Sequence, residues 1–237
     1  MNGVAIVTGG TGTIGAAIAD LFQQRGATIV VADLDERPVA AGQTFVRCDV
    51  TDAKSVAAMF AAAAKLGEIT SVVVAHGILM ETVPGSADPV AVGKVLDVNL
   101  KGAALVCDAA SAYLGDGASI LLLSSMSAFM GRVGGAYAYQ ASKAGIEAIT
   151  RSYAIAYGPR GIRVNCIAPG YMAQPMKGEG SKLRARQGGS DKVREATPLR
   201  RLVTEQELAM SAAFLCSDQA PSITGVVLPV DSGQRAF

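Results

Sequence analysis

Tyr139 and Lys143, four residues apart, form the pair in this sequence best suited to move a proton. In a helix, two positions at this spacing share one face. A free tyrosine titrates at a pH of about 10, and a lysine ammonium beside it favours the phenolate and lowers that pKa. Such a pair can exchange a proton at neutral pH. Because a tyrosine and a lysine on one helix face are often ordinary surface residues, the interpretation needs support from elsewhere in the chain.

Serine hydroxyls upstream of this pair give that support. Ser124 and Ser125 stand fifteen and fourteen residues before Tyr139, at the end of an apolar run that is typical of a buried strand. Parallel sheets bind their ligands at the carboxyl ends of the strands, where a serine hydroxyl can hydrogen-bond a substrate oxygen. Ser127 is a third candidate for this role. Together these residues predict acid–base chemistry on a substrate oxygen.

A glycine-rich turn near the N-terminus predicts a nucleotide site. Gly10, Gly12 and Gly15 satisfy the GxGxxG pattern between a strand-like run and a helical one. Glycines let the turn tighten and let the backbone approach a pyrophosphate, whose charge the following helix N-terminus attracts. The alternative is a purely structural turn. The predicted cofactor contacts in this turn are Gly9, Thr11, Gly12, Thr13, Ile14 and Gly15.

The second predicted strand ends in Asp33, 18 residues after Gly15. A carboxylate there can accept hydrogen bonds from both hydroxyls of the adenosine ribose, and it would repel the 2′-phosphate of NADP. This position therefore implies NAD as the cofactor. Asp35 could take the role instead, and Asp33 could also be a solvated strand end.

Strand and helix patterns that would hold these residues alternate along the chain. Strands are expected at 3–8, 27–32, 44–48, 70–75, 118–124, 162–167 and 225–230. Helices are expected at 14–25, 52–65, with Asp52 as its N-cap, 88–114, broken near Val98 to Gly102, 138–157 and 205–216. The link from Leu34 to Gln43 is too short for a full crossover helix. Several strands are apolar at consecutive positions, as when helices cover both sheet faces. The fold predicted for 1–237 is a single-domain α/β, Rossmann-type doubly wound parallel sheet of about seven strands, with helices on both faces.

The amino-acid composition limits the kinds of partner that we expect the protein to bind. Half of the residues are hydrophobic, 17% are charged, and the formal net charge is +1, so no long-range field favours nucleic acid or an anionic membrane surface. The apolar runs are also too short to span a membrane. The cysteines are far apart, which fits neither a metal site nor a disulfide framework and favours reduced thiols in a cytoplasmic protein. They are Cys48, Cys107, Cys166 and Cys216.

The segment 171–201 differs from the rest of the chain because it is long and rich in glycine and basic residues. Loops of this length in compact domains are often functional, so we expect a lid over the substrate. Its basic side chains would favour a substrate with negative charge. They are Lys177, Lys182, Arg184, Arg186, Lys192 and Arg194.

In these motifs and their order, the chain resembles the short-chain dehydrogenase/reductase family over nearly its whole length. The motifs that carry the resemblance occur in family order. They are the glycine turn, Asp33, Cys48-Asp49-Val50, Val98-Asn99, Ser124-Ser125, Tyr139-xxx-Lys143, Arg163-Val164-Asn165 with Pro169-Gly170, and Val230-Asp231-Ser232-Gly233. The resemblance implies an NAD-dependent oxidoreductase that moves a hydride between the nicotinamide and an alcohol or carbonyl carbon. It also implies a homotetramer or at least a dimer, and apolar positions in 103–110 and 144–156 support that expectation.

The resemblance also implies a role for each matching residue. Tyr139 would be the general acid in reduction and the base in oxidation, and Ser125 would polarise the substrate oxygen. Ser125 is preferred because it keeps the family spacing to Gly131. Lys143 would bind the nicotinamide ribose and tune Tyr139, and Asn99 would hold a water in the proton relay. The remaining implied contacts are Asp49 and Val50 with adenine, Pro169 and Gly170 beside the nicotinamide, and Arg132 and Tyr137 in the substrate pocket.

Three positions depart from the family pattern. Thr13 stands where the middle glycine of the turn is usual, with Gly12 one place earlier. Val74-Ala75-His76-Gly77 replaces a stretch with two asparagines, and Gln174 replaces a common threonine. His76 is the only histidine, and we interpret it as a polar strand end rather than a catalytic group.

Two other functions use related folds. A catalytically silent NAD-binding regulatory protein would have no physical need for Asn99, Ser125, Tyr139 and Lys143 together. A sugar-nucleotide epimerase or dehydratase would be expected to carry a larger C-terminal substrate domain. The sequence leaves the substrate open among secondary alcohols, hydroxysteroids, 3-hydroxyacyl compounds and dihydrodiols.

Overall fold

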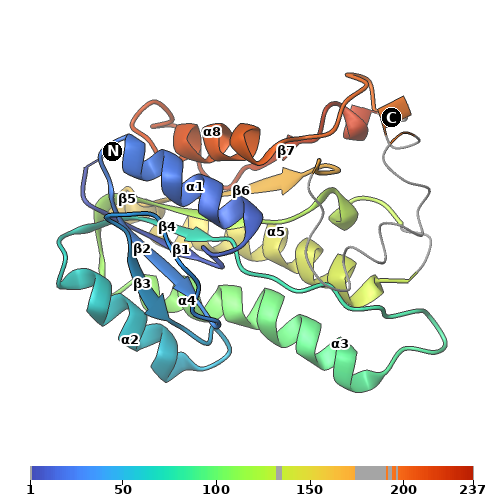
Figure 1. Ribbon diagram of the computed structural model, residues 1–237, viewed down its shortest axis with the longest axis horizontal. Helices are drawn as coiled ribbons and strands as arrows, with labels where there is room; N and C mark the ends of the chain where they lie inside the picture. The colour runs from blue at the N-terminus through green and yellow to red at the C-terminus, as the bar shows by residue number, and fades with distance from the viewer. Residues whose placement is uncertain (1, 132–134, 174–190, 192–193, 196, 237) are drawn as a thin grey trace.

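A seven-stranded parallel sheet forms the centre of the protein, as a computed structural model shows (Figure 1). The structure describes residues 2–131, 135–173, 191, 194–195 and 197–236. The strand order is β3-β2-β1-β4-β5-β6-β7. Successive strands are therefore added on one side of β1 as far as β3, and on its other side from β4 onward. The strands are β1 Val4–Thr8, β2 Thr28–Asp33, β3 Thr44–Arg47, β4 Ile69–Val74, β5 Leu114–Leu123, β6 Arg163–Pro169 and β7 Val227–Val230. The predicted fold class is confirmed.

Helices cover both faces of the sheet, which explains why its inner strands are apolar at consecutive positions. Every residue of β1 is buried. One face packs against α2 (Ala53–Ala64), α4 (Gly102–Ala110) and α5 (Tyr137–Tyr157). The other packs against α1 (Thr13–Gln24) and α8 (Glu205–Leu215), which lie side by side in Figure 1. The expected cap is also present, because the Asp52 side chain accepts a hydrogen bond from the Lys54 N–H at the start of α2.

The long helix expected over 88–114 is broken where the sequence predicted. It consists of α3 (Pro89–Leu96), a π-helical turn η1 (Asp97–Lys101) and α4. A π-helical turn carries one extra residue per turn and is frequent at functional sites. Here it contains Asn99, whose side chain is completely buried. The break therefore places a predicted site residue inside the fold.

Strand β5 differs from the expected element, whereas the link between β2 and β3 agrees with it. Strand β5 begins at Leu114, four residues before the predicted start, because Leu114 pairs with Ile69 ahead of a register shift. Between β2 and β3 no helix forms, as the short link predicted.

No helix in the described ranges is long and apolar enough to cross a membrane. The four cysteines are free, and only Cys216 is partly exposed.

The two ends of the predicted lid lie side by side. Met172 and Val203 form an isolated parallel bridge, and the Val203 N–H donates to the Tyr171 carbonyl at 2.9 Å. The residues on either side of the undescribed stretch are thus paired next to the end of β6. Most of the lid, with Gln174 and the basic side chains from Lys177 to Lys192, lies outside the described residues.

Candidate active site

The turn from β1 into α1 leaves the N-terminus of the helix open. Gly12 is the N-cap and has no side chain to cap the first turn, which also contains no acidic residue. Unpaired N–H groups and the helix dipole make such an end a ready anion site. With Gly12 as the N-cap and Thr13 after it, the helix end thus stays open.

Gly10, Gly12 and Gly15 do not all require glycine for the same physical reason. A Cβ on Gly15 would overlap the Gly9 carbonyl oxygen, and a Cβ on Gly10 would lie 2.8 Å from the Val7 carbonyl oxygen. A Cβ on Gly12 would meet only the Gly9 carbonyl oxygen, at 3.1 Å. Gly10 and Gly15 therefore allow the fold to pack, while Gly12 keeps the surface over the helix end free of side chain. These residues fit the pyrophosphate of a dinucleotide.

Asp33 is fixed beside this turn. Its Oδ2 accepts hydrogen bonds from the Thr11 N–H at 3.1 Å and from the Thr11 hydroxyl at 2.5 Å, while its Oδ1 accepts one from the Leu34 N–H. The alternative carboxylate, Asp35, is exposed. Of the two, Asp33 is the carboxylate tied to the dinucleotide turn.

The residues expected near adenine follow β3. Asp49 Oδ1 accepts hydrogen bonds from the N–H and the hydroxyl of Thr51, and these bonds lower the pKa of its carboxyl group. Val50 is buried, and its Cγ2 lies 2.9 Å from the position of a Cβ on Gly102. The Asp49 carboxylate thus stabilises the backbone turn from Asp49 to Thr51.

Tyr139 and Lys143 lie together near the start of α5. Both are buried, and the Lys143 Nζ is 5.6 Å from the centre of the Tyr139 ring. The same ammonium donates a hydrogen bond to the Leu123 carbonyl at the end of β5, at 2.7 Å. Burial lowers the pKa of Lys143 to about 8. A cation is therefore held beside the phenol at the carboxyl edge of the sheet, where its charge favours the phenolate.

Asn99 connects the segment after β4 to α5. Its Oδ1 accepts from the Ile78 N–H at 2.7 Å, and its Nδ2 donates to the Ile78 carbonyl and to the Ser142 hydroxyl. A Cβ on Gly77 would lie 3.4 Å from both Asn99 Oδ1 and Lys143 Nζ, so these two polar atoms flank the Gly77 backbone. The structure thus brings Asn99 to the Tyr139 and Lys143 pair.

The three serine candidates differ in what their hydroxyls contact. Ser124 is buried, and its hydroxyl lies 2.8 Å from Glu147 Oε1 and 3.1 Å from the Lys143 carbonyl oxygen. Ser125 is half-buried, and its Oγ accepts a hydrogen bond from the N–H of the buried Ser127. Ser125 therefore stands at the exposed end of β5, whereas Ser124 faces the interior.

Glu147 is a site neighbour that the sequence interpretation missed. It follows Lys143 by four residues, as Lys143 follows Tyr139, so the three share one buried face of α5. Burial raises the pKa of its carboxyl group, and the hydrogen bond from Ser124 acts in the opposite direction. The continued four-residue spacing was the available signal, but only the fold shows that this end of the face is covered.

Pro169 and Gly170 lie at the end of β6. The Gly170 N–H donates to the Val230 carbonyl at 2.9 Å, and a Cβ on Gly170 would lie 2.6 Å from the Asp231 Cα. Glycine at this position therefore lets the segment after β7 pass close by. His76, two residues beyond β4, is buried, with its Nδ1 2.7 Å from the Thr8 hydroxyl, as expected for a polar strand end.

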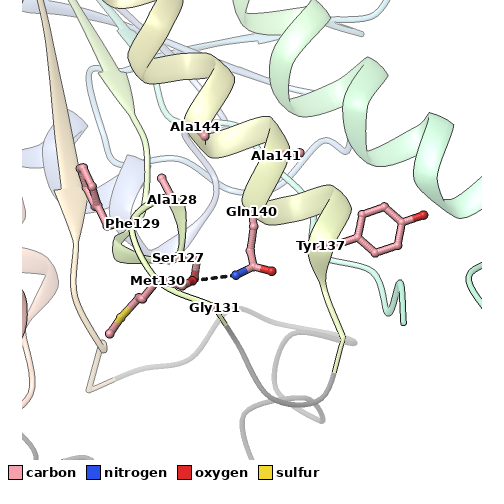
Figure 2. A pocket seen from close by; sticks show the side chains of 9 residues that line it. All are labelled: Ser127, Ala128, Phe129, Met130, Gly131, Tyr137, Gln140, Ala141 and Ala144. Atoms are coloured by element: carbon pink, nitrogen blue, oxygen red, sulfur yellow. Dashed lines mark hydrogen bonds between the residues drawn. The ribbon is translucent and has the colours of Figure 1, made fainter. Parts of the chain in front are cut away.

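Figure 2 shows a hollow on a neighbouring face of α5. It lies between the segment Ser127–Gly131 and the helix, where the Gln140 side chain donates a hydrogen bond to the Met130 carbonyl at 2.7 Å. The helix residues that line it are Tyr137, Gln140, Ala141 and Ala144. Their stripe is adjacent to the one that carries Tyr139 and Lys143. Tyr137 thus lines a hollow beside the candidate site, while Arg132 lies outside the described residues.

Comparisons with known proteins match nearly the whole chain. A family model described as "Enoyl-(Acyl carrier protein) reductase" matches residues 9–235. The chain is 36% identical to cis-4-hydroxycyclohexanecarboxylate dehydrogenase of Sinomonas cyclohexanicum, over 98% of this chain and 96% of the relative. It is 34% identical to 2,5-dichloro-2,5-cyclohexadiene-1,4-diol dehydrogenase of Sphingobium indicum, over 97% and 95% of the two chains. The solved structure of Thermoplasma acidophilum aldohexose dehydrogenase, in ligand-free form, superimposes with a TM-score of 0.91 at 29% identity, over 100% and 95% of the two chains.

Proposed function

The chain belongs to the short-chain dehydrogenase/reductase family, and on that basis we propose that it is an NAD(H)-dependent enzyme that oxidises secondary alcohols or reduces the corresponding ketones. The family binds a nicotinamide cofactor and the named relatives are dehydrogenases, so the coarse activity is that of an oxidoreductase acting on CH–OH groups. The finer assignments concern the cofactor, the proton donor and the substrate, and each rests on particular residues.

The observation that carries the proposed chemistry is the buried Lys143 ammonium beside the Tyr139 ring. In alcohol oxidation Tyr139 accepts the hydroxyl proton of the substrate, and in reduction it returns a proton to the carbonyl oxygen. Lys143 stabilises the phenolate in this exchange. Ser125 donates a hydrogen bond to the same substrate oxygen, which aligns the carbon that reacts. The nicotinamide, when bound, supplies or accepts the hydride.

The dinucleotide turn and Asp33 support NAD as the cofactor. The open N-terminus of α1 would hold the pyrophosphate. The Asp33 carboxylate, held by Thr11, would accept hydrogen bonds from the ribose hydroxyls and oppose a 2′-phosphate. Asp49 and Val50 would contact adenine, and Pro169 with Gly170 would border the nicotinamide. Asn99 would hold a water between Lys143 and solvent for the proton relay.

For the substrate we propose a secondary alcohol on a six-membered ring. The two relatives named above act on hydroxylated six-carbon rings, and both cover nearly the whole chain. The family description instead names an enoyl group on acyl carrier protein, and a further relative, 35% identical, is named acetoacetyl-CoA reductase, so an acyl thioester belongs in the same test.

The test is a turnover assay with the purified protein. NAD⁺ or NADP⁺ is combined with ring alcohols that do or do not carry a carboxylate, with a linear secondary alcohol and with a 3-hydroxyacyl thioester, and reduced nicotinamide is measured. We expect turnover with NAD⁺ and at least one ring alcohol. In Tyr139→Phe, kcat should fall by at least about 10²-fold with the Kd for NADH unchanged, because only the hydroxyl is removed.

Two outcomes would overturn this proposal. NADH binding without turnover of any substrate would indicate a silent binding protein. A kcat near that of the wild type in Tyr139→Phe would assign the proton transfer to another group.

A further inference from the structure

The first turn of α5, which carries Tyr139, has no capping side chain of its own. Its N-cap is Ala136, whose side chain cannot accept a hydrogen bond. The first N–H groups of a helix have no partner inside the helix, and a serine, threonine, aspartate or asparagine at the N-cap usually supplies one. The partner for this helix end must therefore come from another part of the chain.

Thr82, 56 residues before Ala138 in the chain, supplies the missing acceptors. Its hydroxyl oxygen accepts a hydrogen bond from the Ala138 N–H at 3.1 Å, which is the bond that an N-cap side chain would make. The direction of this bond is unambiguous because a backbone N–H can only donate. The Thr82 carbonyl accepts from the Tyr137 N–H at 3.3 Å, and its N–H donates to the Gly135 carbonyl at 3.0 Å. Thr82 thus holds the chain on both sides of the N-cap.

The contact between the two segments is buried and close. Thr82 is 0% exposed and Ala138 is 1% exposed, so water cannot take the place of the threonine hydroxyl. Beside it, Gly135 has a φ of +70°, and a Cβ there would lie 2.8 Å from the Val83 Cα. Loss of the hydroxyl would leave a buried N–H without an acceptor, which is more costly than the loss of an exposed hydrogen bond.

The segment that ends at Thr82 also contacts other residues of the proposed site. Asn99 hydrogen-bonds to both the N–H and the carbonyl of Ile78. The side chains of residues 78–80 pack against the apolar cluster that includes Tyr139. One short segment therefore joins Asn99, the Tyr139 ring and the start of α5.

Tyr139 and Lys143 lie in successive turns of α5 and are held by different contacts. The Lys143 ammonium, in the second turn, donates to the Leu123 carbonyl at 2.7 Å, a bond that does not depend on the helix end. Fraying of the first turn would therefore move the phenol away from an ammonium that stays in place.

We propose that Thr82 is a positioning residue, which caps α5 from outside the helix and thereby keeps Tyr139 beside Lys143. The effect on turnover rests on the proposed function, whereas the cap itself can be tested without a substrate.

Three variants separate the hydroxyl of Thr82 from its bulk and from a general loss of stability. Thr82→Val removes the hydroxyl at nearly constant volume, and Thr82→Ser keeps it. Thr150→Val is the matched control, because Thr150 is also 0% exposed and lies on the same helix, about three turns after Tyr139. The Thr150 hydroxyl donates to the Ile146 carbonyl at 2.8 Å, within α5.

The first measurement is hydrogen–deuterium exchange, followed by mass spectrometry in fragments from the start and from the second half of α5. In Thr82→Val the start of the helix should exchange at least about tenfold faster than in the wild type, because the Ala138 N–H has lost its acceptor. Thr82→Ser should stay within about threefold of the wild type, and Thr150→Val should leave the start unchanged. Wild-type exchange at the start of α5 in Thr82→Val would overturn the proposal, whatever the protein catalyses.

The second measurement compares kcat with the Kd for NADH. Thr82→Val should lower kcat by about tenfold, because a displaced proton donor reacts more slowly. The Kd for NADH should stay within about twofold, since the hydrogen bonds of Thr82 go to residues 135–138 and not to the dinucleotide turn. Thr82→Ser should restore kcat to within about threefold of the wild type, and Thr150→Val should keep it within the same range.

Three results for kcat would each overturn the proposal. An equal loss in Thr82→Val and Thr150→Val would assign the effect to stability, and an equal loss in Thr82→Val and Thr82→Ser would show that the hydroxyl is not its cause. Wild-type kcat in a Thr82→Val protein with rapid exchange would show that the cap does not position Tyr139. If Thr82→Val does not fold, Thr82→Ala takes its place, because alanine also lacks the hydroxyl. If the wild type turns over no substrate, the proposed function fails, and the exchange measurement still decides the cap.

Discussion

At the scale of single residues, the cofactor preference depends on how one carboxylate is held. Both oxygens of Asp33 accept hydrogen bonds from neighbouring backbone N–H groups, and Thr11 adds its hydroxyl. A side chain fixed in this way does not have to lose conformational freedom when a ribose binds. The same rigidity prevents it from moving aside for a phosphate. In the proposed site Asp33 would therefore both bind NAD and oppose NADP.

Replacing Asp33 with alanine should weaken NAD(H) binding by about 1–3 kcal/mol, because two charge-assisted hydrogen bonds are lost. Relative use of NADP(H) should rise. Kd values for NADH and NADPH, measured by fluorescence titration, check this. Asp35→Ala is the matched control, since Asp35 is exposed. A wild type that prefers NADPH, or an equal effect of the control, would show that Asp33 does not read the ribose.

His76 also predicts how stability depends on pH. Its folded pKa of about 3 lies below the ordinary value of 6.5, so in acid the unfolded chain binds a proton that the folded chain does not. Stability should therefore fall as the pH drops from 6.5 toward 3. Between pH 7.5 and 5 this group alone should cost the wild type about 2 kcal/mol. Urea unfolding of wild type and His76→Asn at both pH values measures it, and an equal loss in the two proteins would contradict the shift.

The residues of the proposed site could be located from the sequence, but their networks could not. The four-residue spacing indicated Tyr139 and Lys143, the end of an apolar run indicated Ser125, and the resemblance to the family indicated Asn99. The bond from Ser124 to Glu147 joins β5 to a helix that begins fourteen residues later, and its existence depends on how the two pack. Thr11 binding to Asp33 is of the same kind. Such contacts follow from tertiary packing, which a pattern of residue types does not record.

At the scale of elements, strands and helices matched closely where the pattern was strong. β1 and β2 are short β-branched runs followed by clear turns, so each was expected within one residue of its bounds at either end. The expected break near Val98 to Gly102 is the turn η1. The early start of β5 was missed because its first residues, Leu114 to Gly117, are not an apolar run and pair only through the irregular register at Ile69.

The first strand, turn and helix predict opposite effects for two glycines. In Gly15→Ala the new Cβ would overlap the Gly9 carbonyl, and backbone cannot give way as a side chain does. We expect a loss of at least about 2 kcal/mol in the free energy of unfolding. Gly12 has an extended backbone that alanine tolerates, with one contact at 3.1 Å. Gly12→Ala should stay within about 1 kcal/mol of the wild type and yet weaken NADH binding at least about tenfold, because a methyl group would cover the anion site.

Denaturant unfolding and NADH titration of both variants test the pair. Gly15→Ala should lower the free energy of unfolding. Gly12→Ala should leave that free energy nearly unchanged and raise the Kd for NADH. A Gly12→Ala protein with wild-type affinity would mean that the cofactor does not approach this turn, and an undisturbed Gly15→Ala protein would mean that the turn packs differently.

At the scale of the whole molecule, two separate faces expose small or apolar side chains. On α5 a row of small side chains is exposed, and Ile155 at its end is 79% exposed. α4 is held beside it, because the Tyr153 hydroxyl donates to Asp108 at 2.7 Å. On the opposite side of the sheet, Met210 and Phe214 are partly exposed on α8. The exposed residues of the α5 row are Ala141, Ala144, Ala148, Ser152 and Ile155.

Because the two faces lie on opposite sides of the sheet, each can pair with its own copy about a different two-fold axis, and two such axes generate a tetramer. We therefore expect light scattering to give about four times the mass of one 24.2 kDa chain at micromolar concentration. Ala148→Glu should break the α5 interface and Met210→Glu the α8 interface, so each single variant should give a dimer and the double variant a monomer. Lys54→Glu, an exposed change on α2, should stay a tetramer. A wild-type mass of one chain would refute the assembly, and a tetramer that survives both substitutions would place its interfaces elsewhere on the surface.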